Sequence, residues 1–154
     1  MKVIRSAGLL LFRRSDGGPE VLLGHMGGPY FARRDAGAWT VPKGEYDAGE
    51  PAWDAARREF REELGLPPPD GEAVPLGEAR QANGKIVTAW AIEADLDPAS
   101  IDPGTFRMEW PPGSGRVQEF PELDRVAWFG LDRAREVIVK GQTAFLDRLA
   151  EHSP

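Results

Sequence analysis

The chain has 154 residues, the size of one domain, so we expect residues 1–154 to form a single domain around its own core. Hydrophobic residues make up 41% of the chain and charged residues 29%, as in soluble globular proteins, while a net charge of −6 argues against a nucleic-acid binder with a broad basic face. The absence of cysteine excludes disulfides, thiolate zinc sites and a cysteine nucleophile.

The N-terminal segment predicts a β-hairpin. Val3 to Phe12 reads as a strand, and the unbroken apolar run from Ala7 to Phe12 indicates burial on both faces. Ser15 to Gly18 forms a turn, and Glu20 to Leu23 returns as the second arm.

No stretch of the sequence predicts contact with a membrane. Arg13 and Arg14 end the first apolar run too early for the core of a signal peptide. No segment reaches the roughly 18 consecutive apolar residues of a membrane span. We therefore expect a cytoplasmic protein.

A loop and a short strand precede the most informative stretch of the chain. Gly24 to Ala38 is rich in glycine and arginine and reads as a loop that contains Tyr30 and Phe31. Two aromatic residues in a loop commonly cover a small core, and either residue is also a candidate to stack on a substrate base. Trp39 to Gly44 is predicted to be a short strand.

A helix from about Pro51 to Leu64 would gather three carboxylates. Glu59, Glu62 and Glu63 stand at positions i, i+3 and i+4, so they share one patch of the helix surface and repel one another. A cation at this patch would offset the repulsion, and oxygen ligands alone suit Mg²⁺ or Mn²⁺. The buried stripe of the helix consists of Trp53, Ala56, Phe60 and Leu64.

The second half of the chain predicts further strands. Glu78 to Gln81 and Ile86 to Ile92 read as strands joined by an Asn-Gly turn. Asp95 to Gly104 is a polar connection, Thr105 to Trp110 is a further strand, and Pro111 to Gly115 is a flexible excursion.

The end of the chain predicts a strand and two helices. The loop from Gln118 to Glu122 leads into a strand from Val126 to Phe129. A helix then begins at Leu131, and Gly141 separates it from an amphipathic C-terminal helix.

The stretch from Gly44 to Leu66 resembles the Nudix box, the signature of the Nudix hydrolase family. That pattern reads Gly, five residues, Glu, seven residues, Arg-Glu, an aliphatic residue, any residue, Glu-Glu, any residue, Gly and an aliphatic residue. The residues in register here are Gly44, Glu50, Arg58, Glu59, Glu62, Glu63, Gly65 and Leu66. Phe60 departs from the pattern, but it belongs to the buried stripe, so the acidic face is unchanged.

The resemblance implies an α/β Nudix fold, in which a mixed β-sheet is sandwiched between α-helices, and a hydrolase that uses Mg²⁺ or Mn²⁺. Glu59 and Glu62 would have catalytic roles, and Glu50 and Arg58 would support the box as an ion pair. The implied metal ligands are Glu59, Glu62, Glu63 and the backbone carbonyl of Gly44.

Many Nudix enzymes take a further acid from a loop well beyond the box, as a metal ligand or as the base that deprotonates water. Glu119 and Glu122 stand in a suitable place before the last predicted strand, and we favour Glu122. For either residue, the alternative is a solvated loop carboxylate.

The sequence before the box narrows the expected substrate. Trp39, two residues and then Pro42-Lys43-Gly44 resemble the diadenosine polyphosphate and diphosphoinositol polyphosphate hydrolase branches of the family. We expect a small molecule in which a diphosphate joins a nucleoside to another moiety, with dinucleoside polyphosphates favoured and nucleoside triphosphates, nucleotide sugars and diphosphoinositol phosphates open. The candidate substrate contacts are Lys43, Trp39, Tyr30 and Trp110, although Lys43 is equally compatible with a solvated lysine.

Several alternatives stay open. A Nudix domain can hold a nucleotide as a sensor without cleaving it, and Arg57, Arg58 and Arg61 can make the acidic helix an ordinary solvated surface. His25 and His152 are the two histidines, too few for a histidine-rich metal site, and we expect His25 to be a surface or packing residue. We expect no stable nucleic-acid partner, and the aromatic residues leave a homodimer open.

Overall fold

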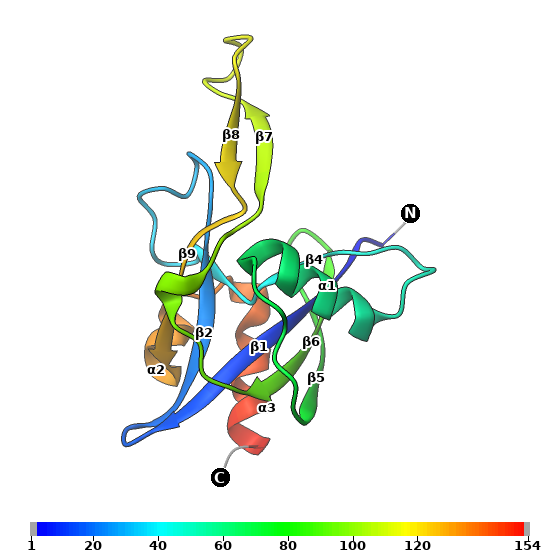
Figure 1. Ribbon diagram of the computed structural model, residues 1–154, viewed down its shortest axis with the longest axis vertical. Helices are drawn as coiled ribbons and strands as arrows, with labels where there is room; N and C mark the ends of the chain where they lie inside the picture. The colour runs from blue at the N-terminus through cyan, green and yellow to red at the C-terminus, as the bar shows by residue number, and fades with distance from the viewer. Residues whose placement is uncertain (1–2, 153–154) are drawn as a thin grey trace.

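A mixed β-sheet forms the centre of the computed structural model, which describes residues 3–152 (Figure 1). Within these residues the sheet has seven strands: β1 (Arg5–Ser15), β2 (Gly18–Met26), β3 (Trp39–Thr40), β4 (Lys43–Glu45), β5 (Ala73–Arg80), β6 (Ile86–Glu93) and β9 (Leu123–Gly130). The main order is β3-β2-β1-β6-β5, with β4 also paired to β1 and β9 to β2. β1 and β6 run parallel and the other pairs are antiparallel, which confirms the mixed sheet.

Helices cover both faces of this sheet. α1 (Ala52–Leu64) packs on one face, and α2 (Leu131–Val137) and α3 (Thr143–His152) pack on the other (Figure 1). Short 3₁₀ turns lie at η1 (Pro98–Ser100) and η2 (Lys140–Gln142), so the predicted break at Gly141 is confirmed. No helix within residues 3–152 is both long and apolar enough to cross a membrane.

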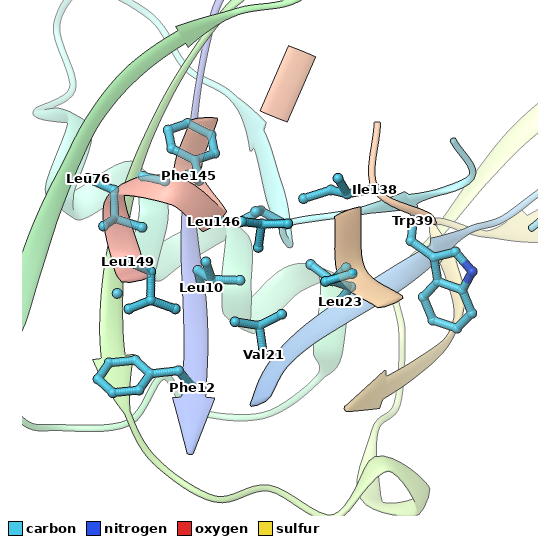
Figure 2. Close-up of a cluster of buried hydrophobic side chains, with 14 of the residues drawn as sticks. Leu10, Phe12, Val21, Leu23, Trp39, Leu76, Ile138, Phe145, Leu146 and Leu149 are labelled. Atoms are coloured by element: carbon cyan, nitrogen blue, oxygen red, sulfur yellow. The ribbon is translucent and has the colours of Figure 1, made fainter. Parts of the chain in front are cut away.

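β1 is buried on both faces, as its apolar run predicts. Leu9 and Leu11 belong to the core under α1, whereas Leu10 and Phe12 belong to the core under α2 and α3. This division follows from the strand geometry, because alternate side chains point to opposite faces. Figure 2 shows the second of these clusters, in which Leu10 lies close to Leu146 of α3. The expected sandwich of a sheet between helices is therefore confirmed.

α1 ends where the sequence predicts and begins one residue later. Pro51 is its N-terminal cap and Ala52 its first residue. Gly65 closes the helix with a left-handed φ of 68°, and a Cβ there would overlap the carbonyl of Asp102. Glycine is therefore required at this position for conformation and for space.

The strand expected from Trp39 to Gly44 is divided in two. β3 pairs with β2, whereas β4 pairs with β1, so the chain changes partner between them. Pro42 lies at this change, where it has no N–H to donate, and its carbonyl accepts a hydrogen bond from the Leu9 amide at 3.2 Å. The division brings β4 beside α1.

A separate two-stranded sheet projects from the body of the molecule (Figure 1). It consists of β7 (Thr105–Glu109) and β8 (Val117–Pro121), joined by the predicted excursion. β7 agrees with the predicted strand. The loop expected from Gln118 to Glu122 is wrong up to Pro121, because these residues continue the ladder with β7, and Phe120 packs against Phe106 with ring centroids 6.0 Å apart.

Candidate active site

A pocket of about 490 Å³ opens between α1, β4 and the base of the β7–β8 hairpin. Five of its lining residues are glutamates, and Lys43 is its one basic residue within the described part of the chain. A pocket with this charge repels phosphate unless cations accompany the phosphate. The lining residues are Ser6, Lys43, Gly44, Glu45, Glu59, Glu62, Glu63, Gly104, Thr105 and Glu122.

α1 presents the three predicted carboxylates to this pocket. Glu59, Glu62 and Glu63 all line it, as their helical spacing requires. The side chain of Glu59 is 12% exposed, whereas that of Glu62 is 57% exposed. Glu63 is half-buried and accepts a hydrogen bond from the backbone amide of Lys43 at 3.3 Å. The carboxylate patch therefore extends from Glu63, which is hydrogen-bonded to β4, to Glu62, which is exposed to solvent.

Glu122 reaches the same pocket because Gly104 connects it to α1. The Gly104 amide donates to the carbonyl of Glu62 at 3.0 Å, and its own carbonyl accepts from the amide of Glu122 at 2.7 Å. A Cβ at position 104 would crowd the Glu62 carbonyl, so the contact needs glycine. The carbonyl of Glu122 also accepts from the Gly27 amide at 3.0 Å, which fixes the residue between β8 and β9.

Glu119, the other acid considered, lies outside this pocket. It is on β8, directly opposite Arg107 of β7, and its side chain is 56% exposed. The structure thus brings Glu122, and not Glu119, to the α1 carboxylates. The catalytic role of Glu122 stays a prediction.

Three of the pocket carboxyls, those of Glu59, Glu63 and Glu122, have pKa values above that of an ordinary glutamate. Burial raises the pKa of Glu63 to about 8, and the charges of Glu59 and Glu122 add to this while Lys43 opposes it. Burial also raises the pKa of Glu59 and that of Glu122, in both cases with a further contribution from Glu62. The acids therefore repel one another across the pocket, as the sequence spacing predicts for those of α1.

Arg58 is the main cationic partner of the box. Its guanidinium donates to both carboxylate oxygens of Glu50, each at 2.9 Å, and this pair lowers the pKa of Glu50. It also donates to Glu59 at 2.7 Å and to Glu62 at 3.2 Å. The expected ion pair between Glu50 and Arg58 is present, and it joins the loop before α1 to the acidic face of the helix.

Lys43 lies at the buried edge of the pocket. Burial lowers the pKa of its ammonium group, and the charge of Glu63 partly offsets this. Lys43 is half-buried, so it is not the fully solvated lysine considered as the alternative. A contact with substrate phosphate stays a prediction.

The structure does not bring the predicted aromatic contacts into the pocket. Trp39 is 3% exposed, its Nε1 donates to Asp35 at 2.8 Å, and its ring packs edge-on against Phe129. It is part of the core, because β3 turns this side chain toward α2. Tyr30 and Trp110 pack edge to face with centroids 5.1 Å apart near the end of the projecting hairpin, and neither lines the pocket.

His25 is a packing residue, one of the two alternatives considered. It is fully buried, its Nδ1 lies 2.9 Å from an Asp124 carboxylate oxygen, and its Nε2 lies 2.7 Å from the carbonyl of Arg34. Since both ring nitrogens face acceptors, the ring ties β2 to the following loop.

Sequence reasoning missed several residues of the pocket. Ser6, Thr105 and Gly104 line it but belong to no recognisable motif. The one sequence feature that marks position 104 is a glycine directly before a predicted strand. Its partners are 42 and 18 residues away in the sequence, so that signal does not identify them.

The donors in the pocket fit a hard divalent cation in chemical type. They are carboxylate and carbonyl oxygens. Burial, and to a lesser extent the neighbouring carboxylates, raise the pKa values of Glu59, Glu63 and Glu122, and a bound cation would stabilise the ionised forms. Within residues 3–152, however, no three acidic or histidine side chains are arranged closely enough to share one ion. Arg58 donates hydrogen bonds to Glu59 and Glu62, which are two of the carboxylates that a metal ion would need as ligands.

Comparison with known proteins gives a family match across almost the whole chain. The family model of the NUDIX domain matches residues 2–149 of this chain. A curated relative, the asymmetrical bis(5'-nucleosyl)-tetraphosphatase of Caenorhabditis elegans, is 39% identical over 64 residues. That match spans 42% of this chain and 42% of the relative's length.

Two solved structures show that the fold is shared more widely. A C. elegans Ap4A hydrolase, solved as a binary complex, aligns over 96% of both chains with a TM-score of 0.65 and 23% identity. The NUDIX domain of Shewanella oneidensis NrtR, solved with ADP ribose, aligns over 99% of this chain and 89% of that one, with a TM-score of 0.61 and 16% identity.

Proposed function

Because this chain belongs to the Nudix family, we propose that it is a divalent-metal-dependent pyrophosphohydrolase that acts on a nucleoside diphosphate linked to another moiety. The observation that carries the proposal is the meeting of three α1 carboxylates with Glu122 in one pocket. Residues 1–154 would act as one domain.

We favour dinucleoside polyphosphates as substrates. The sequence before the box resembles that branch, and the C. elegans relative with local identity to this chain is a bis(5'-nucleosyl)-tetraphosphatase. Nucleoside triphosphates and nucleotide sugars are the next candidates.

Glu59, Glu62, Glu63 and the carbonyl of Gly44 would hold Mg²⁺ or Mn²⁺ in this proposal. Such an ion, when bound, neutralises phosphate charge and lowers the pKa of a bound water. Glu122 would accept the proton of the water that attacks phosphorus, as the bond to the leaving phosphate oxygen breaks. Burial raises the pKa of Glu122, so its carboxylate is a stronger proton acceptor than that of an ordinary glutamate.

Arg58 and Glu50 would act as support for these groups. Two parallel hydrogen bonds fix the guanidinium in its plane, so Arg58 can hold Glu59 in position from the side of the loop. Lys43, at the opposite edge of the pocket, would contact a phosphate oxygen.

A second candidate is a nucleotide sensor that binds without cleavage. One observation favours it: Arg58 already engages Glu59 and Glu62, and no three acids within residues 3–152 are positioned to share an ion. The NUDIX domain of NrtR, a fold relative, was solved with ADP ribose.

The test is a substrate panel with Mg²⁺ or Mn²⁺, containing dinucleoside polyphosphates, nucleoside triphosphates, nucleotide sugars and diphosphoinositol phosphates. We expect released products from at least one class, abolished by chelation. Glu62→Gln should reduce kcat about 100-fold or more, while Glu151→Gln on the exposed end of α3 should leave it unchanged. Binding of a nucleotide by the folded protein with no turnover of any substrate would favour the sensor and contradict the enzyme.

A further inference from the structure

The projecting β7–β8 hairpin has one face that continues the wall of the pocket. Thr105, the first residue of β7, lines the pocket. Side chains two residues apart in a strand share a face, so Arg107 lies on the same face, about 7 Å further along the strand. Figure 1 shows this hairpin extending away from α1 and β4. Arg107 follows Thr105 by two residues along β7, so it lies farther out on the hairpin than the residue that lines the pocket.

The other face of the hairpin is occupied by apolar packing. Phe106 is half-buried, packs against Phe120 and lies close to Gly28 of the neighbouring loop. The exposed and half-buried residues alternate along β7, which confirms that Thr105 and Arg107 are directed away from this packing.

We propose that Arg107 binds phosphate groups of the substrate that extend beyond the bond to be cleaved, and so selects substrates with long phosphate chains. This inference rests on the proposed function. The lining of the pocket supplies Lys43 as its one described basic residue against five glutamates. A polyphosphate chain that leaves the pocket along the hairpin meets its next positive charge at Arg107.

Arg107 is available for such a contact. Its side chain is 77% exposed, and its partner Glu119 is 3.8 Å away and 56% exposed. An exposed ion pair of this length contributes little to stability, so exchanging the carboxylate for phosphate costs little. The planar guanidinium can also donate two parallel hydrogen bonds to phosphate oxygens, which an ammonium group cannot do.

The hairpin supplies its own control residue. The amide of Trp110 donates to the carbonyl of Arg116 at 2.9 Å, which continues the ladder one step past the pair of Glu109 and Val117. Arg116 is therefore on the face opposite to that of Arg107. Both are exposed arginines of one hairpin, and only Arg107 shares the face of Thr105.

The experiment measures kcat and KM of wild type, Arg107→Ala, Arg107→Lys and Arg116→Ala on a dinucleoside tetraphosphate and on a two-phosphate nucleotide sugar. Arg107→Ala should raise KM for the tetraphosphate about tenfold with kcat within about twofold, and should leave KM for the nucleotide sugar unchanged. Arg107→Lys should recover part of the loss, and Arg116→Ala should match wild type. Glu119→Gln, which removes the competing carboxylate, should lower KM for the tetraphosphate.

Equal KM values for Arg107→Ala and Arg116→Ala on the tetraphosphate would overturn the inference and leave the proposed function intact. Turnover of the nucleotide sugar alone would also overturn it. Absence of turnover of every substrate by folded wild type would instead overturn the proposed function. Circular dichroism of each variant establishes that the hairpin substitutions leave the fold unchanged.

Discussion

Gly44 lies so close to the carboxylate of Glu59 that a Cβ at position 44 would overlap its carboxylate oxygens. The glycine is on β4 and the glutamate on α1, two elements that meet only through tertiary packing. The position of Glu59, which is 12% exposed, is therefore set partly by the absence of a side chain across from it.

We predict that Gly44→Ala displaces Glu59 and lowers kcat at least tenfold. The free energy of unfolding should fall by no more than about 1 kcal/mol, because the atoms that a Cβ would meet are the far end of a flexible side chain that can move. Gly49→Ala is the matched control, because Gly49 lies in the loop between β4 and α1 and a Cβ there meets nothing within 4 Å. Steady-state kinetics and thermal melts check both effects, and equal behaviour of the two variants would contradict this account of Gly44.

A second prediction concerns pH and the metal-free protein. Glu63 has a pKa of about 8 in the folded state against 4.5 for an ordinary glutamate, so between these pH values the folded protein holds a proton that the unfolded chain releases. The contribution of Glu63 to the free energy of unfolding should therefore be greatest below about pH 4.5 and should be lost as the pH rises to about 8. At about 1.4 kcal/mol per pKa unit, the loss is several kcal/mol.

Glu63→Gln removes this titration. In chelator, we expect its melting temperature at pH 8 to exceed that of wild type by on the order of 5–10 °C, with a smaller difference at pH 5. Mg²⁺ should raise the melting temperature of wild type more at pH 8 than at pH 5, and should have little effect on the variant. Parallel pH profiles for wild type and Glu63→Gln would show that this carboxyl does not control the pH dependence.

A third prediction tests the geometry of the ion pair that joins the loop to α1. Arg58 donates two parallel hydrogen bonds to Glu50 while contacting Glu59, which a lysine cannot reproduce. Arg58→Lys keeps the charge but should lower the free energy of unfolding by about 1–2 kcal/mol and reduce kcat several-fold. Arg61→Lys, an exposed position on the same helix, should have no effect on either quantity in urea unfolding and steady-state assays.

The α1 carboxylates could be predicted from sequence because their arrangement is local. Helical spacing alone places Glu59, Glu62 and Glu63 on one patch, and Gly65 marks the end of the helix. The apolar run of β1 likewise predicts a strand that is buried on both faces. In each case, residues a few positions apart in sequence determine the result.

The rest of the site depends on contacts between distant segments. Trp39 is next to the box in sequence, yet the pairing of β3 with β2 turns its side chain into the core. Gly104 contacts both Glu62 and Glu122 through backbone hydrogen bonds, and such bonds cannot be predicted from residue type. The β7–β8 ladder was missed on its second strand because Val117 to Pro121 is largely exposed and shows no regular alternation of apolar and polar residues.

The last prediction separates the two roles open to Glu122. The residue lines the pocket, and burial together with the charge of Glu62 raises its pKa, so its ionised form is a stronger proton acceptor than an ordinary glutamate. Glu122→Gln cannot accept a proton but keeps an oxygen donor. We expect kcat to fall about 100-fold or more, with loss of the rise in kcat between acidic and neutral pH, while the Mg²⁺ concentration for half-maximal activity stays within about twofold. Glu119→Gln is the control, since that carboxylate lies outside the pocket, and its kcat should equal that of wild type.

A large shift in the Mg²⁺ requirement with an unchanged pH profile would assign Glu122 to metal binding instead. A metal ligand changes the affinity of the protein for the ion, whereas a general base changes the dependence of kcat on pH.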